Sequence, residues 1–327
     1  MINRLGIVEG YYGNLSTFEQ RKLIVKTLST HNLNFYLYAP KEDPFLRSHI
    51  DIDHSDNWFA EFENFLGYAK DLNIEVGIGL APTKSSNITA LKKKINNFTE
   101  RGVNCFSILF DDIEENFSFN DQLNIFREIK SEFPNLYFDF CPTVYSKELI
   151  EKDSIHKNYF EQFIQGFPRS EEFFWTGEKV ISTNMDASCQ EELHQFENEN
   201  IAIWDNYFTI DSQPKKLNIS YFDYLDKTFL TTKKCYVVNL TGMPRHDNLI
   251  INLMGSFVAG KKDSFESILL KHGVDERFLE FIGLFDPKNK MNLKKEEKDK
   301  IHKIMFTWFH PLKNEWYPYL HNLKNWE

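Results

Sequence analysis

The chain has 327 residues, of which 42% are hydrophobic and 16% aromatic. This length suits one α/β barrel with a short extension better than two domains of equal size. The 48 acidic residues outnumber the 38 basic ones and give a formal net charge of −10. A surface that follows nucleic-acid phosphates or an anionic membrane needs a basic face, so neither is an expected partner.

The cysteines and the first residues predict a cytoplasmic protein. Cys105, Cys141, Cys189 and Cys235 show no C-x-x-C spacing, and reduced, buried thiols are the simplest interpretation. A strand pattern already begins at Leu5, which leaves no room for a signal peptide. No apolar run reaches the ~18 residues that a membrane span requires.

Short apolar runs alternate with amphipathic segments along most of the chain. The runs are rich in Ile, Val, Leu, Phe and Tyr, as in strands buried on both faces, and clear helical patterns follow seven of them. Repeated βα units predict a parallel sheet, and eight of them predict a closed (β/α)8 barrel. The expected strands are Leu5–Tyr12, Phe35–Pro40, Ile74–Pro82, Cys105–Ile113, Leu136–Tyr145, Glu172–Gly177, Ile201–Tyr207 and Lys234–Leu240. The expected helices are Thr17–Leu28, Trp58–Leu72, Ile88–Glu100, Asp121–Phe133, Tyr159–Phe167, Cys189–Glu199 and Asn248–Ala259.

An open, doubly wound sheet is the alternative architecture. Such a sheet usually carries a glycine-rich turn after its first strand, and the GYYG of residues 10–13 is no dinucleotide fingerprint. The connection over residues 208–233 is irregular in either architecture.

Beyond about residue 260 the strand patterns stop and helical spacing continues. We therefore expect a catalytic barrel over residues 1–260 and a short C-terminal helical extension over residues 261–327 that packs on it. The expected helices of the extension are Phe265–His272, Asp275–Leu284 and Glu296–Phe309.

Polar residues gather at the ends of the expected strands, where barrel enzymes place their reactive groups. Asp111 and Asp112 directly follow five apolar or small residues of the fourth strand. Adjacent carboxyls in a partly desolvated mouth push one pKa up, so one can stay protonated while the other is ionised. The alternatives are a helix cap, a solvated turn or metal ligation. The other polar or aromatic residues at strand ends are Glu9, Lys41, Asp139, Thr143, Tyr145, Trp175, Thr176, Trp204, Asp205, Asn206, Asp211 and Asn239.

The sequence gives no sign of a metal site or a cofactor. The ten histidines are scattered and show no H-E-x-x-H or paired spacing. Cys141 has no evident histidine partner, so we expect an inert pocket wall there and not a nucleophile.

Six segments, each at the end of an expected strand, resemble glycoside hydrolase family 84. These are the β-N-acetylglucosaminidases that include protein O-GlcNAcases and bacterial so-called hyaluronidases. The resemblance covers roughly residues 1–260 and implies a (β/α)8 barrel that hydrolyses β-linked N-acetylglucosamine (GlcNAc). The segments, in the family's order, are VEGYYG (8–13), YAPKEDP (38–44), ILFDDI (108–113), CPTVY (141–145), FWTG (174–177) and IWDNY (203–207).

The resemblance also implies roles for individual residues. Asp112 would be the general acid and then the general base, and Asp111 would hold the N–H of the substrate's acetamido group. Tyr145 would donate a hydrogen bond to the forming ring oxygen. The residues implied for the sugar hydroxyls or the acetamido group are Gly10, Lys41, Asn206, Asp211 and Asn239, and those for the acetyl-methyl pocket are Cys141 and Trp204.

Two neighbouring acids on one strand cannot straddle a sugar ring, as an ordinary retaining mechanism requires. A 2-acetamido sugar offers another route, because its own carbonyl oxygen can attack the anomeric carbon and form an oxazoline. One aspartate would orient the amide while its neighbour protonates the leaving group. Strand alternation points Asp111 and Asp112 to opposite sides, so the backbone must turn at the strand end for them to converge.

The expected function is a retaining β-N-acetylglucosaminidase that removes terminal β-GlcNAc from protein Ser or Thr residues or from glycans. A catalytically inactive GlcNAc-binding module on the same barrel is one alternative. A metal-dependent barrel hydrolase is another. The sequence does not settle the oligomeric state.

Overall fold

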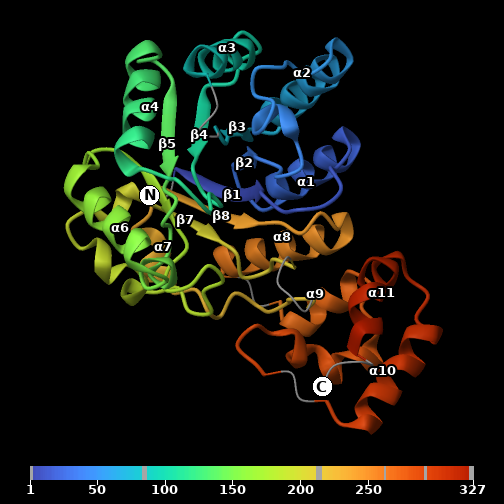
Figure 1. The fold of residues 1–327 in the computed structure, drawn as a ribbon. Coiled ribbons are helices and arrows are strands. Elements are labelled where there is room, and N and C mark those ends of the chain that lie inside the picture. The colour runs from blue at the N-terminus through green and yellow to red at the C-terminus, as the bar shows by residue number, and fades with distance from the viewer. Residues whose placement is uncertain (1–2, 83–86, 211–215, 261–262, 291–292, 324–327) are drawn as a thin grey trace.

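A computed structural model describes residues 3–82, 87–210, 216–260, 263–290 and 293–323. Its centre is a closed parallel barrel in which eight strands neighbour one another in chain order and β1 pairs with β8 (Figure 1). The predicted barrel is thus confirmed. The strands are β1 (Arg4–Glu9), β2 (Phe35–Tyr38), β3 (Glu75–Leu80), β4 (Cys105–Leu109), β5 (Tyr137–Cys141), β6 (Phe173–Trp175), β7 (Ile201–Asp205) and β8 (Cys235–Asn239).

The observed strands end earlier than the apolar patterns predict. The last residues of most apolar runs leave the sheet and form loops at the carboxyl end of the barrel, where the polar residues lie. The helices that surround the barrel are α1 (Phe18–Thr30), α2 (Asp56–Asp71), α3 (Ile88–Thr99), α4 (Phe119–Glu132), α5 (Lys147–Ile150), α6 (Ser154–Gly166), α7 (Lys227–Thr231) and α8 (Pro244–Ala259). The short 3-10 segments between them are η1 (Pro44–Leu46), η2 (Ala187–Leu193) and η3 (Asn198–Asn200).

Helices begin where the sequence supplies a capping side chain. Thr17 accepts a hydrogen bond from the backbone N–H of Gln20, whose side chain accepts one from Thr17 in return, so α1 begins with a capping box. Ser55, Asn87 and Ser118 cap α2, α3 and α4 through their side-chain oxygens.

The prediction of one helix over Cys189–Glu199 is wrong. Residues 187–200 form the two 3-10 segments η2 and η3, and Gln190 has a non-helical φ of −133°. The ammonium of Lys233, which is 1% exposed, binds the side-chain oxygen of Gln190 and the carbonyl oxygen of Asn198. A buried ammonium needs such oxygen partners, and we infer that this need overrides helix propensity here.

The hydrophobic core has two layers. Strand residues of one parity fill the barrel interior, among them Val8, Leu37 and Leu109. Residues of the other parity, such as Ile7 and Phe106, pack against the surrounding helices. The strands are therefore apolar on both faces, as the continuous sequence runs indicate.

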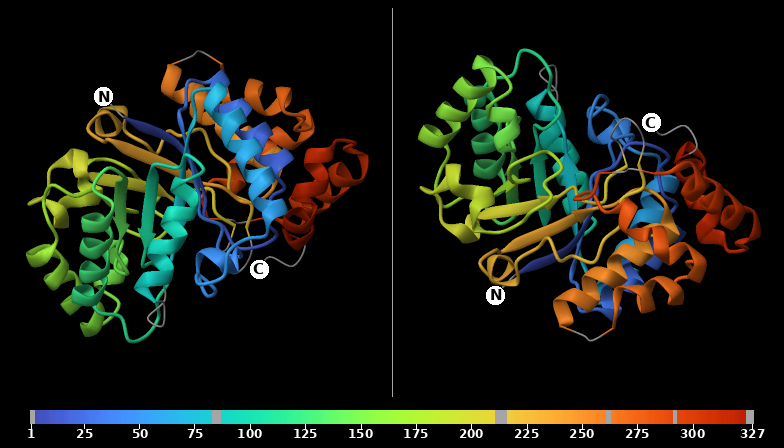
Figure 2. Two further views of the ribbon diagram at one scale, coloured as in Figure 1. Left: turned by 90° about the horizontal axis from the view of Figure 1, so that it is seen from above. Right: turned by 90° about the horizontal axis from the view of Figure 1, so that it is seen from below.

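The C-terminal helices lie beside α8, on the side of the barrel away from α4 and α6 (Figures 1 and 2). Trp316 is fully buried and donates from Nε1 to Nδ1 of His246 in α8, at 3.2 Å. Sequence patterns missed α11, since Pro311 opens it and Pro318 lies inside it. The domain boundary at residue 260 stays a prediction. The elements are α9 (Phe265–Lys271), η4 (Glu276–Phe285), α10 (Lys295–Thr307) and α11 (Pro311–Asn322).

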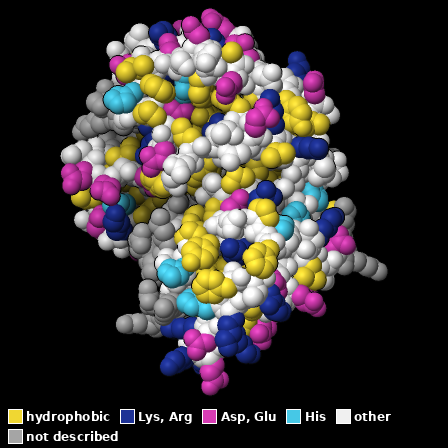
Figure 3. Space-filling model, turned by 90° about the vertical axis from the view of Figure 1, so that its right-hand side faces the viewer, with side chains coloured by type: hydrophobic (Ala, Val, Ile, Leu, Met, Phe, Trp, Pro, Cys, Tyr) yellow, Lys and Arg dark blue, Asp and Glu magenta, His cyan; other side chains and the backbone are white. Residues whose placement is uncertain are grey.

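The surface view in Figure 3 shows Lys and Arg side chains close to Asp and Glu side chains on one face. Within the described part of the chain, no helix combines the length and the hydropathy that crossing a membrane requires. All four cysteines are buried and free, as predicted.

Candidate active site

A cavity of about 760 Å³ opens at the carboxyl ends of the strands, and nine of the ten predicted site residues line it. The tenth, Asp211, lies outside the described residues. The nine are Gly10, Lys41, Asp111, Asp112, Cys141, Tyr145, Trp204, Asn206 and Asn239. Among the described residues, every strand except β3, or the loop that follows it, contributes to the lining of the cavity.

Asp111 and Asp112 converge because the backbone turns between them. Asp112 has a φ of 57°, the left-handed conformation that aspartate adopts more readily than most residues. As a result both carboxylates reach the ammonium of Lys41, with Asp112 Oδ2 at 3.0 Å from Nζ and Asp111 Oδ2 in direct contact with it. The oxazoline route described above requires these two side chains to converge, and they do.

Two tyrosines bind the more accessible member of the pair. The hydroxyl of Tyr12 donates to Asp112 Oδ2 at 2.9 Å, and that of Tyr145 donates to Oδ1 at 3.2 Å. The Asp112 side chain is 31% exposed, whereas that of Asp111 is 10% exposed. Sequence reasoning did not predict a role for Tyr12, although it lies inside the VEGYYG segment.

Burial and Lys41 act differently on the two carboxyls. Burial raises the pKa of Asp111 and outweighs the opposing effect of Lys41, while the neighbouring Asp112 adds to the rise. Burial also acts to raise the pKa of Asp112, but the charge of Lys41 and hydrogen bonds from Lys41 and Tyr12 lower it on balance. Of the two carboxyls Asp111 therefore has the higher pKa, whereas the family resemblance assigns the acid role to Asp112.

One oxygen of the pair is left without a partner. Asp111 Oδ1 is buried and accepts no hydrogen bond from the described residues, although Asp111 lines the cavity. A buried acceptor without a donor costs free energy, about 1–3 kcal/mol. A ligand that brings an N–H to this point would remove that cost.

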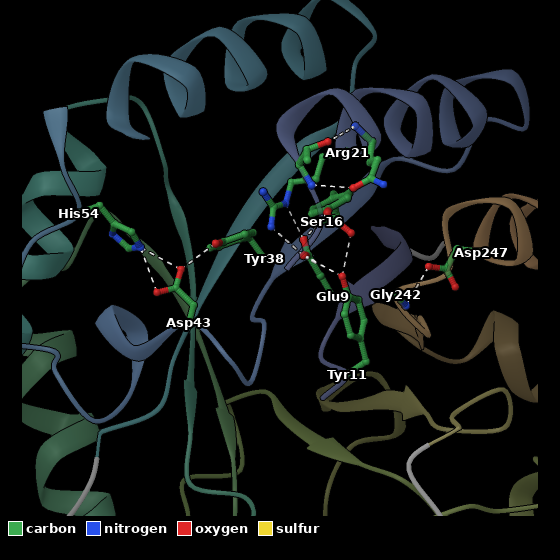
Figure 4. A network of polar contacts seen from close by, with 12 residues as sticks. Glu9, Tyr11, Ser16, Arg21, Tyr38, Asp43, His54, Gly242 and Asp247 are labelled. Atoms are coloured by element: carbon green, nitrogen blue, oxygen red, sulfur yellow. Dashed lines mark hydrogen bonds and ion pairs between the residues drawn. The ribbon is translucent and has the colours of Figure 1, made fainter. Parts of the chain in front are cut away.

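Asp43, two residues after Lys41, fixes the segment that carries this lysine. Asp43 accepts hydrogen bonds from Tyr38 at 2.7 Å and from His54 Nε2 at 2.9 Å, and it also caps η1 through the N–H of Phe45 (Figure 4). The His54 ring is itself buried. This arrangement fixes the short segment that carries the ammonium.

A chain of hydrogen bonds forms another wall of the cavity. The N–H of Gly10 donates to Asn239 Oδ1 at 3.1 Å, and Asn239 Nδ2 donates to Asn206 Oδ1 at 2.9 Å. Trp204 Nε1 donates to the same Asn206 oxygen at 3.0 Å. A Cβ on Gly10 would lie 2.5 Å from the Trp204 ring, so the first position of this chain has room only for glycine.

Three acids expected near the strand ends do not line the cavity. Glu9 accepts both hydrogen bonds of the Arg21 guanidinium, at 2.8 and 2.9 Å, and points toward Arg21 and Tyr11 in Figure 4. Asp205 accepts from Tyr224 at 2.5 Å. Asp139 pairs with Arg4, the first residue of β1, at the opposite end of the barrel. These three carboxylates serve the fold and not the cavity.

The rim contains residues that sequence reasoning missed. Glu148 Oε2 accepts from the N–H of Val180 at 3.0 Å, and Asn206 Nδ2 donates to the Val180 carbonyl at 3.0 Å. The loop after β6 therefore connects α5 to the wall formed by β7. Most of the missed residues lie in irregular loops, which no periodic pattern marks, whereas Glu148 and Leu149 lie in the short helix α5 and Phe174 lies in β6. The missed lining residues are Tyr12, Glu148, Leu149, Lys152, Phe174, Lys179, Val180, Ile181 and Thr209.

Within the described ranges, no group of three or more His, Cys, Asp and Glu side chains is arranged to hold a metal ion. Burial raises the pKa of the Cys141 thiol well above its usual value. A thiol in that environment is a poor nucleophile. The chemistry available at the aspartate pair is that of two carboxyls, the ammonium of Lys41 and hydrogen-bond donors.

Comparison with known proteins identifies relatives of this chain and a solved structure of the same fold. The Protein O-GlcNAcases of Mus musculus and Rattus norvegicus are each 28% identical to this chain over 234 residues, which make up 65% of the chain and 25% of the relative. The chain thus spans about a quarter of the length of these relatives. A mutant O-GlcNAc hydrolase of Thermobaculum terrenum has the same fold, with a TM-score of 0.79 at 19% identity over 99% of this chain and 82% of that one. The model of the beta-N-acetylglucosaminidase family matches residues 5–268, and the chain belongs to that family.

Proposed function

We propose that the chain is a retaining β-N-acetylglucosaminidase that works by substrate-assisted catalysis through an oxazoline. The observation that carries the proposal is the convergence of Asp111 and Asp112 on one cavity, with a buried, unpaired acceptor on Asp111. An amide N–H of the substrate's acetamido group is the donor that this oxygen lacks. The acetamido oxygen is then held near the anomeric carbon, where it acts as the internal nucleophile.

The proposed reaction moves one proton at a time. As the acetamido oxygen bonds to the anomeric carbon, the bond to the leaving oxygen breaks and Asp112 delivers a proton to it. Asp111 accepts the hydrogen bond of the amide N–H and stabilises the positive charge that develops there. In the second half, Asp112 removes a proton from water, which attacks the anomeric carbon and reopens the oxazoline. Asp112 thereby regains the proton it lost.

Substrate binding has to reverse the order in which the two carboxyls take up a proton, so that Asp112 becomes the protonated one. The hydrogen bond from the acetamido N–H stabilises ionised Asp111, which lowers the pKa of that carboxyl. A sugar in the cavity also excludes water from Asp112, which raises the pKa of the second carboxyl. The two groups titrate as a pair, so both changes favour the state that the acid step needs.

The proposed substrates carry terminal β-linked GlcNAc on a protein or a glycan. The mouse and rat relatives are Protein O-GlcNAcases, and this similarity favours the protein form. We also propose a cytoplasmic location, since the four free, buried cysteines suit a reducing compartment.

The test compares leaving groups in Asp112→Asn. A GlcNAc-serine peptide leaves as a basic alkoxide and needs the proton, so its kcat/KM should fall by ~10²–10⁴-fold. A 2,4-dinitrophenyl glycoside leaves as a weak base and should lose far less. Asp121→Asn, at an exposed position of α4, is the matched control and should behave as the wild type.

Equal losses with both leaving groups would contradict the acid role of Asp112. Binding of GlcNAc by the wild type without turnover of either substrate would show an inactive module instead. Loss of activity on exhaustive chelation would indicate a metal-dependent hydrolase.

A further inference from the structure

The segment that follows β7 is tied to the C-terminal helices through Asp286, the residue directly after η4. Asp286 Oδ1 accepts a hydrogen bond from the Tyr207 hydroxyl at 2.6 Å, and Oδ2 accepts one from Ser220 at 2.8 Å. The N–H of Ile219 donates to the carbonyl oxygen of Phe285 at 2.9 Å. One carboxylate thus joins the two ends of this segment to the helical region.

Tyr207 connects that carboxylate to the cavity. It directly follows Asn206, is fully buried, and stacks on the Tyr224 ring with centroids 3.6 Å apart. Its N–H donates to Asp205 Oδ1 at 2.8 Å. A tyrosine held at its backbone, its ring and its hydroxyl leaves the adjacent residue little freedom.

Asn206 is the junction of the cavity wall. Its Oδ1 accepts from both Trp204 and Asn239, and its Nδ2 donates to the loop after β6. A shift of the backbone at Asn206 would therefore disturb the side chains of Trp204 and Asn239 and the loop after β6 at once.

A second polar contact joins the C-terminal helices to the barrel at α8, the helix that follows β8. No side chain of its own segment caps α8, and Glu315 of α11 instead accepts hydrogen bonds from the N–H groups of Arg245 and His246 at 3.0 Å each. α8 follows β8 and Asn239 after a short turn, and Asp247 of α8 binds the N–H of Gly242 in that turn (Figure 4). The helical region thus contacts the segment after β7, which begins with Asn206, and the first turn of α8, the helix that follows Asn239 of β8.

We propose that Asp286 is a positioning residue for the active site: through Tyr207 it holds Asn206, and with it the wall that binds the sugar. This proposal rests on the proposed function only for its kinetic readout. In this proposal the C-terminal helices position residues of the active site, in addition to packing against α8.

The experiment compares Tyr207→Phe, Asp286→Ala and the double variant with the wild type. Asp275→Ala is the matched control, because Asp275 caps the other end of η4 and its side chain binds only Arg277 among the described residues. KM for a β-GlcNAc glycoside should rise about tenfold in Tyr207→Phe and in Asp286→Ala, the size expected for losing a hydrogen bond to a charged group. The double variant should be no worse than the poorer single one, and kcat should change less than threefold.

Hydrogen–deuterium exchange over residues 203–210 gives a second readout that needs no turnover. Exchange should speed up in Tyr207→Phe and Asp286→Ala but not in Asp275→Ala, even where the melting temperatures fall equally. Wild-type KM together with unchanged exchange in both variants would overturn the positioning role. A wild type that hydrolyses no glycoside would contradict the proposed function alone, and the exchange comparison would still decide this proposal.

Discussion

The catalytic proposal depends at the residue scale on three charges within a few ångströms. Lys41 is buried, and although burial alone would lower its pKa, Asp111 and Asp112 raise it well above the usual value. Lys41 therefore carries its positive charge at neutral pH. It allows two adjacent carboxyls to share a cavity without strong mutual repulsion.

Replacing Lys41 with methionine should change the pH profile of the reaction. The pKa of both carboxyls should rise by at least about one unit, because the charge that lowers them is lost. Ionised Asp111 is required, so the acid limb of kcat/KM should move to higher pH. Rate measurements between pH 4 and 8 would test this, with Lys92→Met on the surface of α3 as the control. An unmoved acid limb would contradict the role given to Lys41.

Gly10→Ala should weaken binding through crowding. The added methyl would lie 2.5 Å from the Trp204 ring and 3.0 Å from Asn239 Oδ1. Overpacking of this kind costs ~1–3 kcal/mol, so KM should rise by about tenfold or more. Gly67→Ala is the control: nothing lies within 4 Å of its Cβ, and alanine should stabilise α2 by ~1 kcal/mol. Wild-type KM in Gly10→Ala would show that this wall does not contact the sugar.

At the scale of elements, the turn at the end of β4 decides what the aspartate pair can do. A regular strand through Asp112 would send its carboxylate toward the helices, whereas a φ of 57° returns it to the cavity. The turn after β8 is held in a comparable way, since Asp247 accepts hydrogen bonds from the N–H and hydroxyl of Thr241 at 2.9 and 2.7 Å.

The buried carboxyl of Asp247 should make the stability of the fold depend on pH. Burial raises the pKa of Asp247 from 3.8 to about 7, against hydrogen bonds from Thr241 that lower it. Because the folded pKa is above the unfolded one, the neutral form contributes stability at low pH, and this is lost as pH rises toward 7. The free energy of unfolding should fall by roughly 2–3 kcal/mol more in the wild type than in Asp247→Asn between pH 5 and 8. Parallel urea-unfolding curves for the two proteins at both pH values would contradict this.

The sequence predicted the strands and most of the helices well, but it did not predict the contacts between the loops. Continuous apolar runs identified all eight strands, and nine of the ten residues proposed for the site line one cavity, while their roles stay predictions. The contact of Lys41 with both acids, the role of Tyr12 and the Asn206–Asn239 bond depend on loops that meet only after the barrel closes. The helix prediction over Cys189–Glu199 was wrong. We infer that Gln190 and Asn198 leave α-helical geometry to bind the buried ammonium of Lys233, which lies too far along the chain for a local pattern to include it.

At the scale of the whole molecule, barrel and C-terminal helices share polar contacts at two loops. Asp286 and Glu315 reach from the helical region to the segments after β7 and β8. Because Asn206 begins the first of these segments and Asn239 directly precedes the second, a boundary at residue 260 would separate the barrel from residues that contact both segments. The prediction of two domains therefore needs a test by truncation and not by sequence pattern alone.

The charge balance around Lys41 has a consequence for ionic strength. The molecule as a whole carries a formal charge of −10, yet the ammonium compensates the carboxylates inside the cavity. A neutral sugar can enter without releasing a counterion, so its binding should not follow the bulk salt concentration. KM for a neutral GlcNAc glycoside should stay within about twofold between 0.05 and 0.5 M NaCl. A steep salt dependence would mean that mobile ions, and not Lys41, neutralise the acids.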